Sequence, residues 1–152
     1  NGRKVKGLRE INGKIYYFSD GPESRYGHYY DQVRGLLVNP YNENYYNSTS
    51  KAAPTYFFDA ETGAALTNQF FNWEGDWYYF GPDGKALIFD QVINGQHLYF
   101  RNNGKQVKGQ FISDYKGTRY YDENSGELVT NQTRTINGVT YLFDENGRPT
   151  QL

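Results

Sequence analysis

A short aromatic cluster recurs along the chain at a nearly constant interval, and this repeat limits the possible folds more than any other feature. The last residues of successive clusters lie 40, 22, 20, 21 and 22 positions apart, so the repeat is about 21 residues long with one double step. Short fixed intervals are typical of proteins that stack one small unit on the next. The clusters are Tyr16–Phe18, Tyr56–Phe58, Tyr78–Phe80, Leu98–Phe100, Arg119–Tyr121 and Tyr141–Phe143.

Turn signals recur with the same interval on both sides of the clusters. Asn-Gly and Asp-Gly pairs favour the tight turns that join antiparallel strands, so each unit is predicted to be a hairpin. Its first strand holds segments such as 68–72 or 109–113, and its second strand holds the cluster. No stretch keeps a helical apolar period over ten or more residues. The signals before the clusters are Asn12-Gly13, Glu74-Gly75, Asn94-Gly95, Lys116-Gly117 and Asn137-Gly138, and those after include Asp20-Gly21, Thr62-Gly63, Asp83-Gly84, Asn103-Gly104, Ser125-Gly126 and Asn146-Gly147.

An isolated two-stranded hairpin is only marginally stable in water, whereas a row of hairpins is stable when each buries an aromatic face on the next. We therefore predict an all-β chain, a β-solenoid of stacked two-stranded hairpins with repeats of about 21 residues. Side chains alternate faces along a strand, so the last cluster positions can form one buried aromatic row, here called the spine. The spine residues are Phe18, Phe58, Phe80, Phe100, Tyr121 and Phe143.

The interval breaks once, and this break defines the predicted organisation. We expect a single repeat array over 1–152, with a repeat at 1–21, a degenerate repeat plus a long loop at 22–54, and regular repeats at 55–152. Within the degenerate part we expect an eroded hairpin near 25–38 and a loop up to Pro54. Both ends fall inside a unit and the chain has no Met, so we expect a fragment of a larger polypeptide.

Composition excludes several classes of function. The chain has no Cys and no Met, and its 16 basic and 17 acidic residues are scattered singly. We therefore expect no thiolate metal site, no nucleic-acid partner and no membrane insertion. The two histidines, His28 and His97, have no nucleophile motif or phosphate loop to accompany them, so we predict a chain that is not an enzyme and needs no cofactor.

Repeated aromatic rings beside amide side chains suit carbohydrate binding. Sugars present apolar C–H faces that lie flat on a ring, and hydroxyl groups at the edge that Gln, Asn or Lys can meet. Tyr and Phe supply most of the 18% aromatic content, and most of these rings must form the core. The composition therefore favours sugar binding by a minority of the rings.

Several units resemble a known family. Residues 93–100 (Ile-Asn-Gly-Gln-His-Leu-Tyr-Phe), 104–110 (Gly-Lys-Gln-Val-Lys-Gly-Gln) and 77–84 (Trp-Tyr-Tyr-Phe-Gly-Pro-Asp-Gly) are similar to cell-wall-binding and glucan-binding repeats, most closely to the glucan-binding domain of bacterial glucansucrases. The resemblance covers 1–21 and 55–152 well and 22–54 poorly. It implies stacked hairpins, pockets for a dextran-type α-glucan between them, a secreted or cell-surface location, and a catalytic domain elsewhere in the parent protein.

The resemblance also implies which residues bind. Such pockets combine a stacking aromatic residue with a Gln-x-Lys pair, and the only complete pair that we recognise is Gln106 with Lys108. We expect Trp77, Tyr78 or Tyr99 to serve as the sugar platform and Tyr120 as a second wall.

Three alternatives remain open at this stage. Lys108 could equally be a solvent-exposed strand residue that binds nothing and whose aliphatic stem covers an aromatic ring. A choline or teichoic-acid attachment module would need aromatic cages for a quaternary ammonium, and Trp73 and Trp77 are the only tryptophans. A structural or protein-adhesive array would have no sugar site.

Overall fold

The computed structural model describes residues 7–19, 31–40 and 55–152, and within these ranges every regular element is a β-strand. The all-β prediction is confirmed. No helix in the described ranges has the length and hydrophobicity to cross a membrane. The chain divides into two compact units, Asn1–Leu87 with Asn102–Gly104 and Ile88–Arg101 with Lys105–Leu152, and each unit is described by itself.

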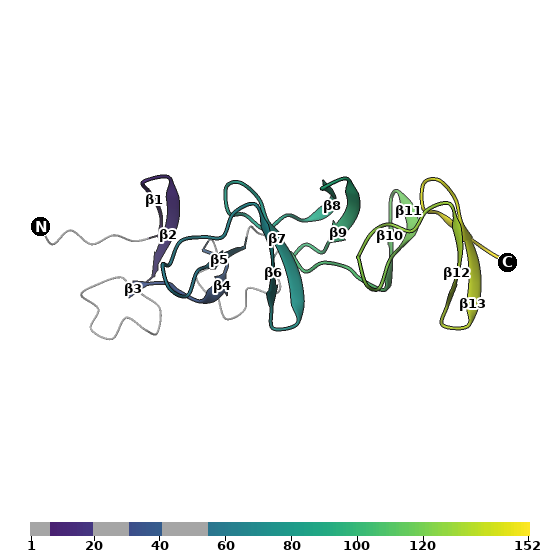
Figure 1. Ribbon diagram of the computed structural model, residues 1–152, viewed down its shortest axis with the longest axis horizontal. Coiled ribbons are helices and arrows are strands. Elements are labelled where there is room, and N and C mark those ends of the chain that lie inside the picture. The colour runs from purple at the N-terminus through teal and green to yellow at the C-terminus, as the bar shows by residue number, and fades with distance from the viewer. Residues whose placement is uncertain (1–6, 20–30, 41–54) are drawn as a thin grey trace, which may run out of the picture. The chain divides into compact units, whose positions relative to one another are not determined.

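The first unit contains three antiparallel hairpins (Figure 1). Strands β1 (Gly7–Ile11) and β2 (Lys14–Ser19) form the first, and β3 (Asp31–Gln32) pairs with the other edge of β2. Strands β4 (Leu36–Val38) and β5 (Tyr56–Phe58) form the second. Strands β6 (Gln69–Trp73) and β7 (Asp76–Phe80) form the third.

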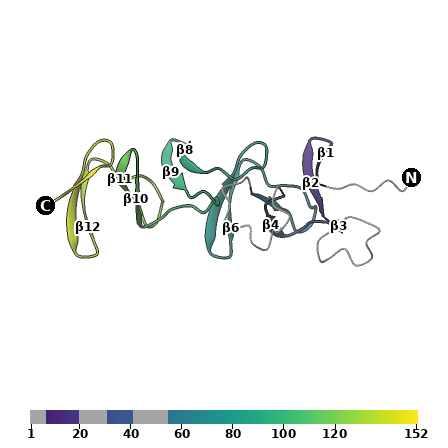
Figure 2. The same ribbon diagram turned by 180° about the vertical axis from the view of Figure 1, so that it is seen from behind.

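The second unit repeats the same pattern, and Figure 2 shows its hairpins from behind. Strands β8 (Phe89–Ile93) and β9 (Gln96–Phe100) form one hairpin, and β10 (Gln110–Asp114) and β11 (Gly117–Tyr121) form the next. Strands β12 (Gln132–Ile136) and β13 (Val139–Phe143) form the last, and β14 (Pro149–Gln151) pairs with β13.

Four of the predicted hairpin turns have the backbone that Asn-Gly pairs favour. In each, both loop residues have positive φ, for example 53° at Asn94 and 79° at Gly95. The two-residue loop fixes the register, so that Ile93 lies opposite Gln96. The other three are Asn12-Gly13, Glu74-Gly75 and Asn137-Gly138.

The turn predicted at Lys116-Gly117 is wrong by one residue. The loop of this hairpin is Tyr115-Lys116, and Gly117 is the first residue of β11. Positive φ falls on Gly117 alone, at 101°, and the carboxylate of Asp114 accepts a hydrogen bond from the backbone N–H of Lys116 at 2.9 Å. An Asx turn therefore replaces the Asn-Gly turn here.

Five of the six predicted spine residues lie in the core. Phe58, Phe80, Phe100 and Phe143 have no exposed surface and Tyr121 has 1%, whereas Phe18 is half-buried. Rings pack between successive hairpins within each unit. Tyr17 stacks on Phe58 with centroids 5.8 Å apart, and Tyr99 contacts Tyr121 at 5.7 Å. Contact between hairpins thus supplies the burial that a single hairpin lacks.

The segment predicted as degenerate contains a strand that pairs with the next aromatic cluster. Leu36–Val38 pairs with Tyr56–Phe58, from Leu36 opposite Phe58 to Val38 opposite Tyr56. The expected eroded hairpin near 25–38 is wrong for residues 36–38, because their partner lies in the next aromatic cluster. Residues 25–30 and the predicted loop residues 41–54 lie outside the described ranges.

Candidate functional site

Gln106 and Lys108 lie together in the second unit, on the segment that follows β9. Gln106 forms a β-bridge with the spine residue Phe100, and the N–H of Val107 donates to the carbonyl of Tyr99 at 2.8 Å. Because Gln106 and Lys108 are two residues apart, their side chains share a face. Both side chains lie over Gly126, whose added Cβ would be 3.3 Å from Gln106 Cδ and from Lys108 Cγ. We call this arrangement the Gln106 pocket.

The turn beneath these side chains is fixed by Asp122. Its Oδ1 accepts hydrogen bonds from the backbone N–H groups of Asn124 and Ser125, at 2.7 and 2.8 Å. Its Oδ2 pairs with Arg134 at 2.9 Å. These bonds orient the turn so that the carbonyl of Asn124 accepts from Lys108 Nζ at 3.2 Å. The turn under Gln106 and Lys108 is therefore held by a carboxylate that bonds to the backbone of the turn and to Arg134.

This arrangement predicts that the second unit becomes less stable at acid pH. Hydrogen bonds from the backbone of Ser125 and Asn124, aided by Arg134, lower the pKa of Asp122 to about 2. A lowered pKa stabilises the fold above the unfolded value near 4, and this stability is lost as the pH falls toward 2. We expect a loss of about 1 kcal/mol, less than the full shift implies because the carboxylate still reaches solvent. Urea unfolding between pH 5 and pH 2.5 measures it.

The Asp122→Asn variant is the control for this acid effect. It keeps the side-chain carbonyl but has no proton to gain, so its stability should fall less over the same pH interval. An equal loss in both proteins would show that the Asp122 carboxylate does not cause it. Asp114, whose pKa is lowered chiefly by a hydrogen bond from Arg119, titrates in both proteins and cancels in the comparison.

The first unit contains a second copy of this arrangement, here called the Gln32 pocket. Gln32 lies opposite the spine residue Phe18, and the N–H of Val33 donates to the carbonyl of Tyr17 at 2.9 Å. Gln32 and Arg34 lie over Gly63, whose added Cβ would be 2.8 Å from Gln32 Cδ and 3.3 Å from Arg34 Cγ. The same backbone path and the same glycine contact thus recur 74 residues earlier.

The cation and the turn also correspond in the two pockets. Arg34 Nη1 donates to the carbonyl of Glu61 at 2.6 Å, as Lys108 does to Asn124. Asp59 Oδ2 accepts from the backbone N–H groups of Glu61 and Thr62, both at 2.9 Å, and these bonds, that of Thr62 first, lower the pKa of Asp59. The Gln32 pocket differs in one respect, because the guanidinium of Arg34 also donates to Gln32 Oε1, at 2.8 and 3.1 Å.

The sequence contained a signal for this second pair that our sequence analysis missed. Gln32-Val33-Arg34-Gly35 matches Gln106-Val107-Lys108-Gly109, and the two glycines have φ values of 65° and 67°. At the other described spine residues, the partner on the segment after the hairpin carries no amide, although Gln69, Gln110 and Gln132 lie opposite Phe80, Tyr121 and Phe143 within their hairpins. The partners without an amide are Ala65, Ala86, Leu128 and Pro149.

Each pocket has one tyrosine on the preceding hairpin. Tyr99 is half-buried, and the guanidinium of Arg119 lies 6.0 Å from its ring centroid. Burial, and then the charge of Asp114, raises the pKa of the Tyr99 hydroxyl. Tyr17 occupies the corresponding place in the first unit and is also half-buried. Both tyrosines therefore keep part of their surface accessible, on the strand that pairs with a Gln-x-cation segment.

The other predicted residues belong to the first unit or are buried. Trp77, 39% exposed, and Tyr78, 3% exposed, belong to the first unit. Tyr78 packs against Phe80, and burial raises its pKa to about 12. Tyr120, 6% exposed, is in the second unit with its ring against Phe111 at 4.9 Å. The structure thus places Tyr99 on the strand that pairs with the Gln106–Lys108 segment, with its ring packed on the Val107 side, and it buries Tyr120.

Comparison with known families agrees with the repeat pattern. Residues 91–132 match the family described as choline-binding repeat, and residues 68–86 match the one described as putative cell wall binding repeat. Residues 68–86 and 91–132 are therefore repeats of the choline-binding and cell-wall-binding kind. The expected membership in this repeat family is confirmed.

Similar sequences are found in streptococcal glucosyltransferases. The chain is 45% identical, over 97% of its length, to Glucosyltransferase-I of Streptococcus downei, and 35% identical, also over 97%, to Glucosyltransferase-S of Streptococcus mutans. It spans 8% and 9% of the lengths of these two proteins. Over nearly its whole length, the chain is homologous to a region of these much longer proteins.

Solved structures support the same fold. Choline binding protein F of Streptococcus pneumoniae matches with a TM-score of 0.68 at 22% identity, over 96% of this chain and 45% of that protein. CbpJ of the same species matches with a TM-score of 0.65 at 20% identity, over 96% of this chain and 41% of that protein. At such identities the likeness concerns the fold alone, which is a series of two-stranded hairpins of the kind seen in choline-binding repeat solenoids.

Proposed function

We propose that this chain is a non-catalytic carbohydrate-binding module that binds a dextran-type α-glucan through the Gln106 and Gln32 pockets. The observation that carries the proposal is the recurrence of one arrangement in both units. In each, a Gln amide and a cationic side chain lie over a glycine, on a segment whose middle residue bonds to the backbone of a half-buried tyrosine. Repeats without this pair keep the fold, so the pair is not needed for folding.

The residues of each pocket match the chemistry of a neutral sugar. A glucose unit offers hydroxyl groups that both donate and accept, and the Gln amide can do the same. Lys108 or Arg34 adds charged donors, which form stronger hydrogen bonds than neutral ones. The exposed part of Tyr99 or Tyr17 can cover an apolar C–H face. One shallow pocket of this kind should bind at about millimolar Kd, and several pockets on one polymer would bind more tightly.

The proposal extends to the parent protein. Homology to glucosyltransferases over nearly the whole chain supports a parent that is an extracellular or cell-surface glucansucrase, with transglucosylation performed by a domain outside this chain. The repeats would then hold the enzyme on its polymer. Matches to cell-wall-binding repeats support the same location.

Replacing the two cations tests the proposal. We expect Lys108→Ala and Arg34→Ala each to reduce retardation on dextran affinity gels, and the double variant to lose most of it. Each substitution removes charged hydrogen bonds worth roughly 1.5–3 kcal/mol, which corresponds to about a tenfold or greater loss at that pocket. For each protein, the measured quantity is the dextran concentration that halves its mobility in a native gel.

Lys85→Ala is the matched control. Lys85 is a half-exposed lysine of the first unit whose nearest acidic partner, Asp83, lies 4.0 Å away. Its loss should leave retardation unchanged. A double variant that is retarded as strongly as the wild type would remove both pockets from the site. If the wild-type chain is not retarded by dextran but is retained on immobilised choline, the result favours choline attachment. If it is retained by neither, the result favours a structural array.

A further inference from the structure

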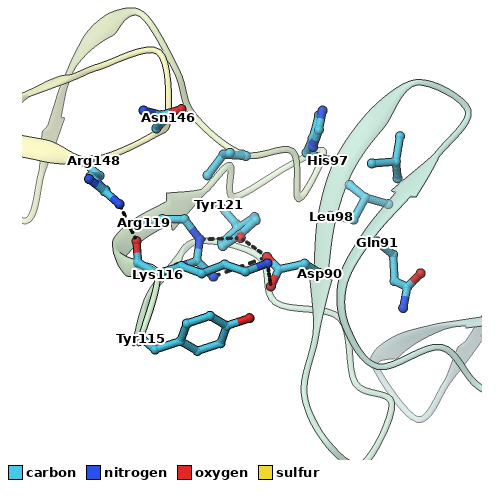
Figure 3. A pocket seen from close by; sticks show the side chains of 12 residues that line it. Asp90, Gln91, His97, Leu98, Tyr115, Lys116, Arg119, Tyr121, Asn146 and Arg148 are labelled. Carbon is cyan, nitrogen blue, oxygen red and sulfur yellow. Dashed lines mark hydrogen bonds and ion pairs between the residues drawn. The ribbon is translucent and has the colours of Figure 1, made fainter.

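A second cavity lies within the second unit, away from the Gln106 pocket. Figure 3 shows it from close by, with side chains from β8 and β9, the loop before β11 and the turn after β13. Its volume is about 700 Å³. Neither Gln106 nor Lys108 lines it, and we call it the Arg148 groove.

A buried guanidinium organises one side of this groove. Arg119 is 4% exposed, and each of its five N–H donors has an acceptor. Nε donates to the hydroxyl of Tyr121 at 3.2 Å, Nη1 to Asp114 and the carbonyl of Gly117, and Nη2 to Asp114 and Asp90. Arg119 is therefore saturated, and its role is to hold the neighbouring groups in place.

Asp90 is the group that this network fixes at the groove surface. Its Oδ1 accepts from Arg119 at 3.3 Å and from the hydroxyl of Tyr121 at 3.4 Å, and its Oδ2 pairs with Lys116 at 3.1 Å. Three of the four or so lone-pair positions of this carboxylate are thus occupied. Asp90 is the acidic residue among the lining residues, and its charge is compensated within the network.

Arg148 supplies the uncompensated charge. Its Nη2 donates to the carbonyl of Lys116 at 3.3 Å, and within the described part of the chain it forms no ion pair. Four of its N–H donors and two of those on Lys116 remain for a ligand. The nearby carboxylate of Asp144 accepts backbone N–H groups of its own turn, from Asn146 at 2.9 Å and Arg148 at 2.8 Å. The groove therefore has more free donors than acceptors.

The remaining walls combine the polar side chains of Gln91, His97 and Asn146 with exposed apolar surface. Tyr115 is 92% exposed and Val92 is 62% exposed, and both line the groove. A cavity of this size falls in the range of small-molecule sites and is far larger than a lone oxyanion. A sugar ring can lie on Tyr115 while a group attached to it reaches Arg148 and Lys116.

We propose that the Arg148 groove binds an acidic saccharide, a sugar unit that carries a carboxylate or a phosphate. The anionic group accepts hydrogen bonds from Arg148 and Lys116, and the ring lies against Tyr115. Donors in excess, an unpaired guanidinium and an exposed ring together favour such a ligand over a neutral sugar. Three cationic lining residues also exclude a quaternary ammonium. This site is independent of the proposed α-glucan pockets.

Titration of the full chain by ¹⁵N NMR tests the proposal, with glucuronate and glucose 6-phosphate as separate probes and glucose as the neutral control. We expect one or both acidic sugars to shift the signals of residues 115–117 and 146–148 with millimolar Kd, and glucose to leave them in place. The tighter of the two identifies the anionic group. Binding should weaken several-fold between 50 and 500 mM NaCl because salt screens exposed charges.

Arg148→Gln should weaken this binding by about tenfold. Arg9→Gln is the matched control, since Arg9 is an exposed arginine of the first unit whose guanidinium also donates to one backbone carbonyl, that of Leu8 at 2.9 Å. Equal shifts with glucose, or unchanged affinity in Arg148→Gln, would overturn the proposal. Failure of the α-glucan pockets would instead appear as unshifted signals at residues 106–108 and 126 with isomaltotriose, so the two results are distinguishable.

Discussion

Gly126→Ala is expected to close the Gln106 pocket and to lower its affinity for isomaltotriose by tenfold or more. The added methyl group would overlap the side-chain amide of Gln106 and lie 3.3 Å from Lys108 Cγ. Both polar groups would have to move away from the position that the pocket requires. Signals of residues 106–108 in an NMR titration measure the loss, while the Gln32 pocket in the same molecule should keep its affinity.

The control for this prediction is Gly138→Ala. Gly126 and Gly138 have similar φ values, 76° and 82°, so a side chain is strained at either position, at a cost of about 1 kcal/mol. Gly138 has no atom within 4 Å of its added Cβ. The two variants should therefore lose similar stability, and only Gly126→Ala should lose binding. Equal affinity in both would mean that Gln106 and Lys108 do not bind the sugar.

Phe100→Ala is expected to destabilise the second unit by about 3–5 kcal/mol. Phe100 has no exposed surface, and its removal leaves a cavity that the short strands of a hairpin cannot fill. A repeat array has few contacts beyond nearest neighbours, so the loss should be confined to this unit. Urea unfolding followed by tyrosine fluorescence measures the change.

The partner of Phe100 across the hairpin provides the matched control. Phe89 lies directly opposite Phe100 but is 46% exposed. Phe89→Ala removes the same kind of ring from the same hairpin. The positive φ of 63° at residue 89 strains Phe and Ala equally, so it does not contribute to the difference. We expect it to cost less than about 1 kcal/mol. Similar losses in the two variants would contradict the assignment of Phe100 to the spine.

Much of the fold could be predicted because its determinants are local. Two adjacent residues with positive φ, such as Asn94-Gly95, fix a hairpin and its register, and the next spine residue then follows at a set distance. The dipeptide pattern predicted a turn at Lys116-Gly117, but Asp114 makes an Asx turn that begins earlier, so the loop is Tyr115-Lys116. It also misassigned residues 36–38, whose strand partner lies some twenty residues away.

The site was harder to predict because exposure depends on packing between hairpins. Tyr78 and Tyr120 belong to the same kind of aromatic cluster as the half-buried Tyr99, and only packing on neighbouring residues decides that they are buried. Gln32 and Arg34 were overlooked because they lie beside a stretch where the aromatic interval fails. Their match to Gln106 and Lys108 is local, and it becomes informative once both are seen opposite a spine residue.

The residues that build the scaffold are different from the residues that line the pockets. Spine rings and turn glycines hold every hairpin, whereas the bridge position opposite the spine accepts Gln, Ala, Leu or Pro without loss of the fold. Natural variation can therefore create or erase a pocket by one or two point substitutions while the framework stays under selection. Under the proposed function, such substitutions would change the number and kind of sugars bound while the fold stays the same.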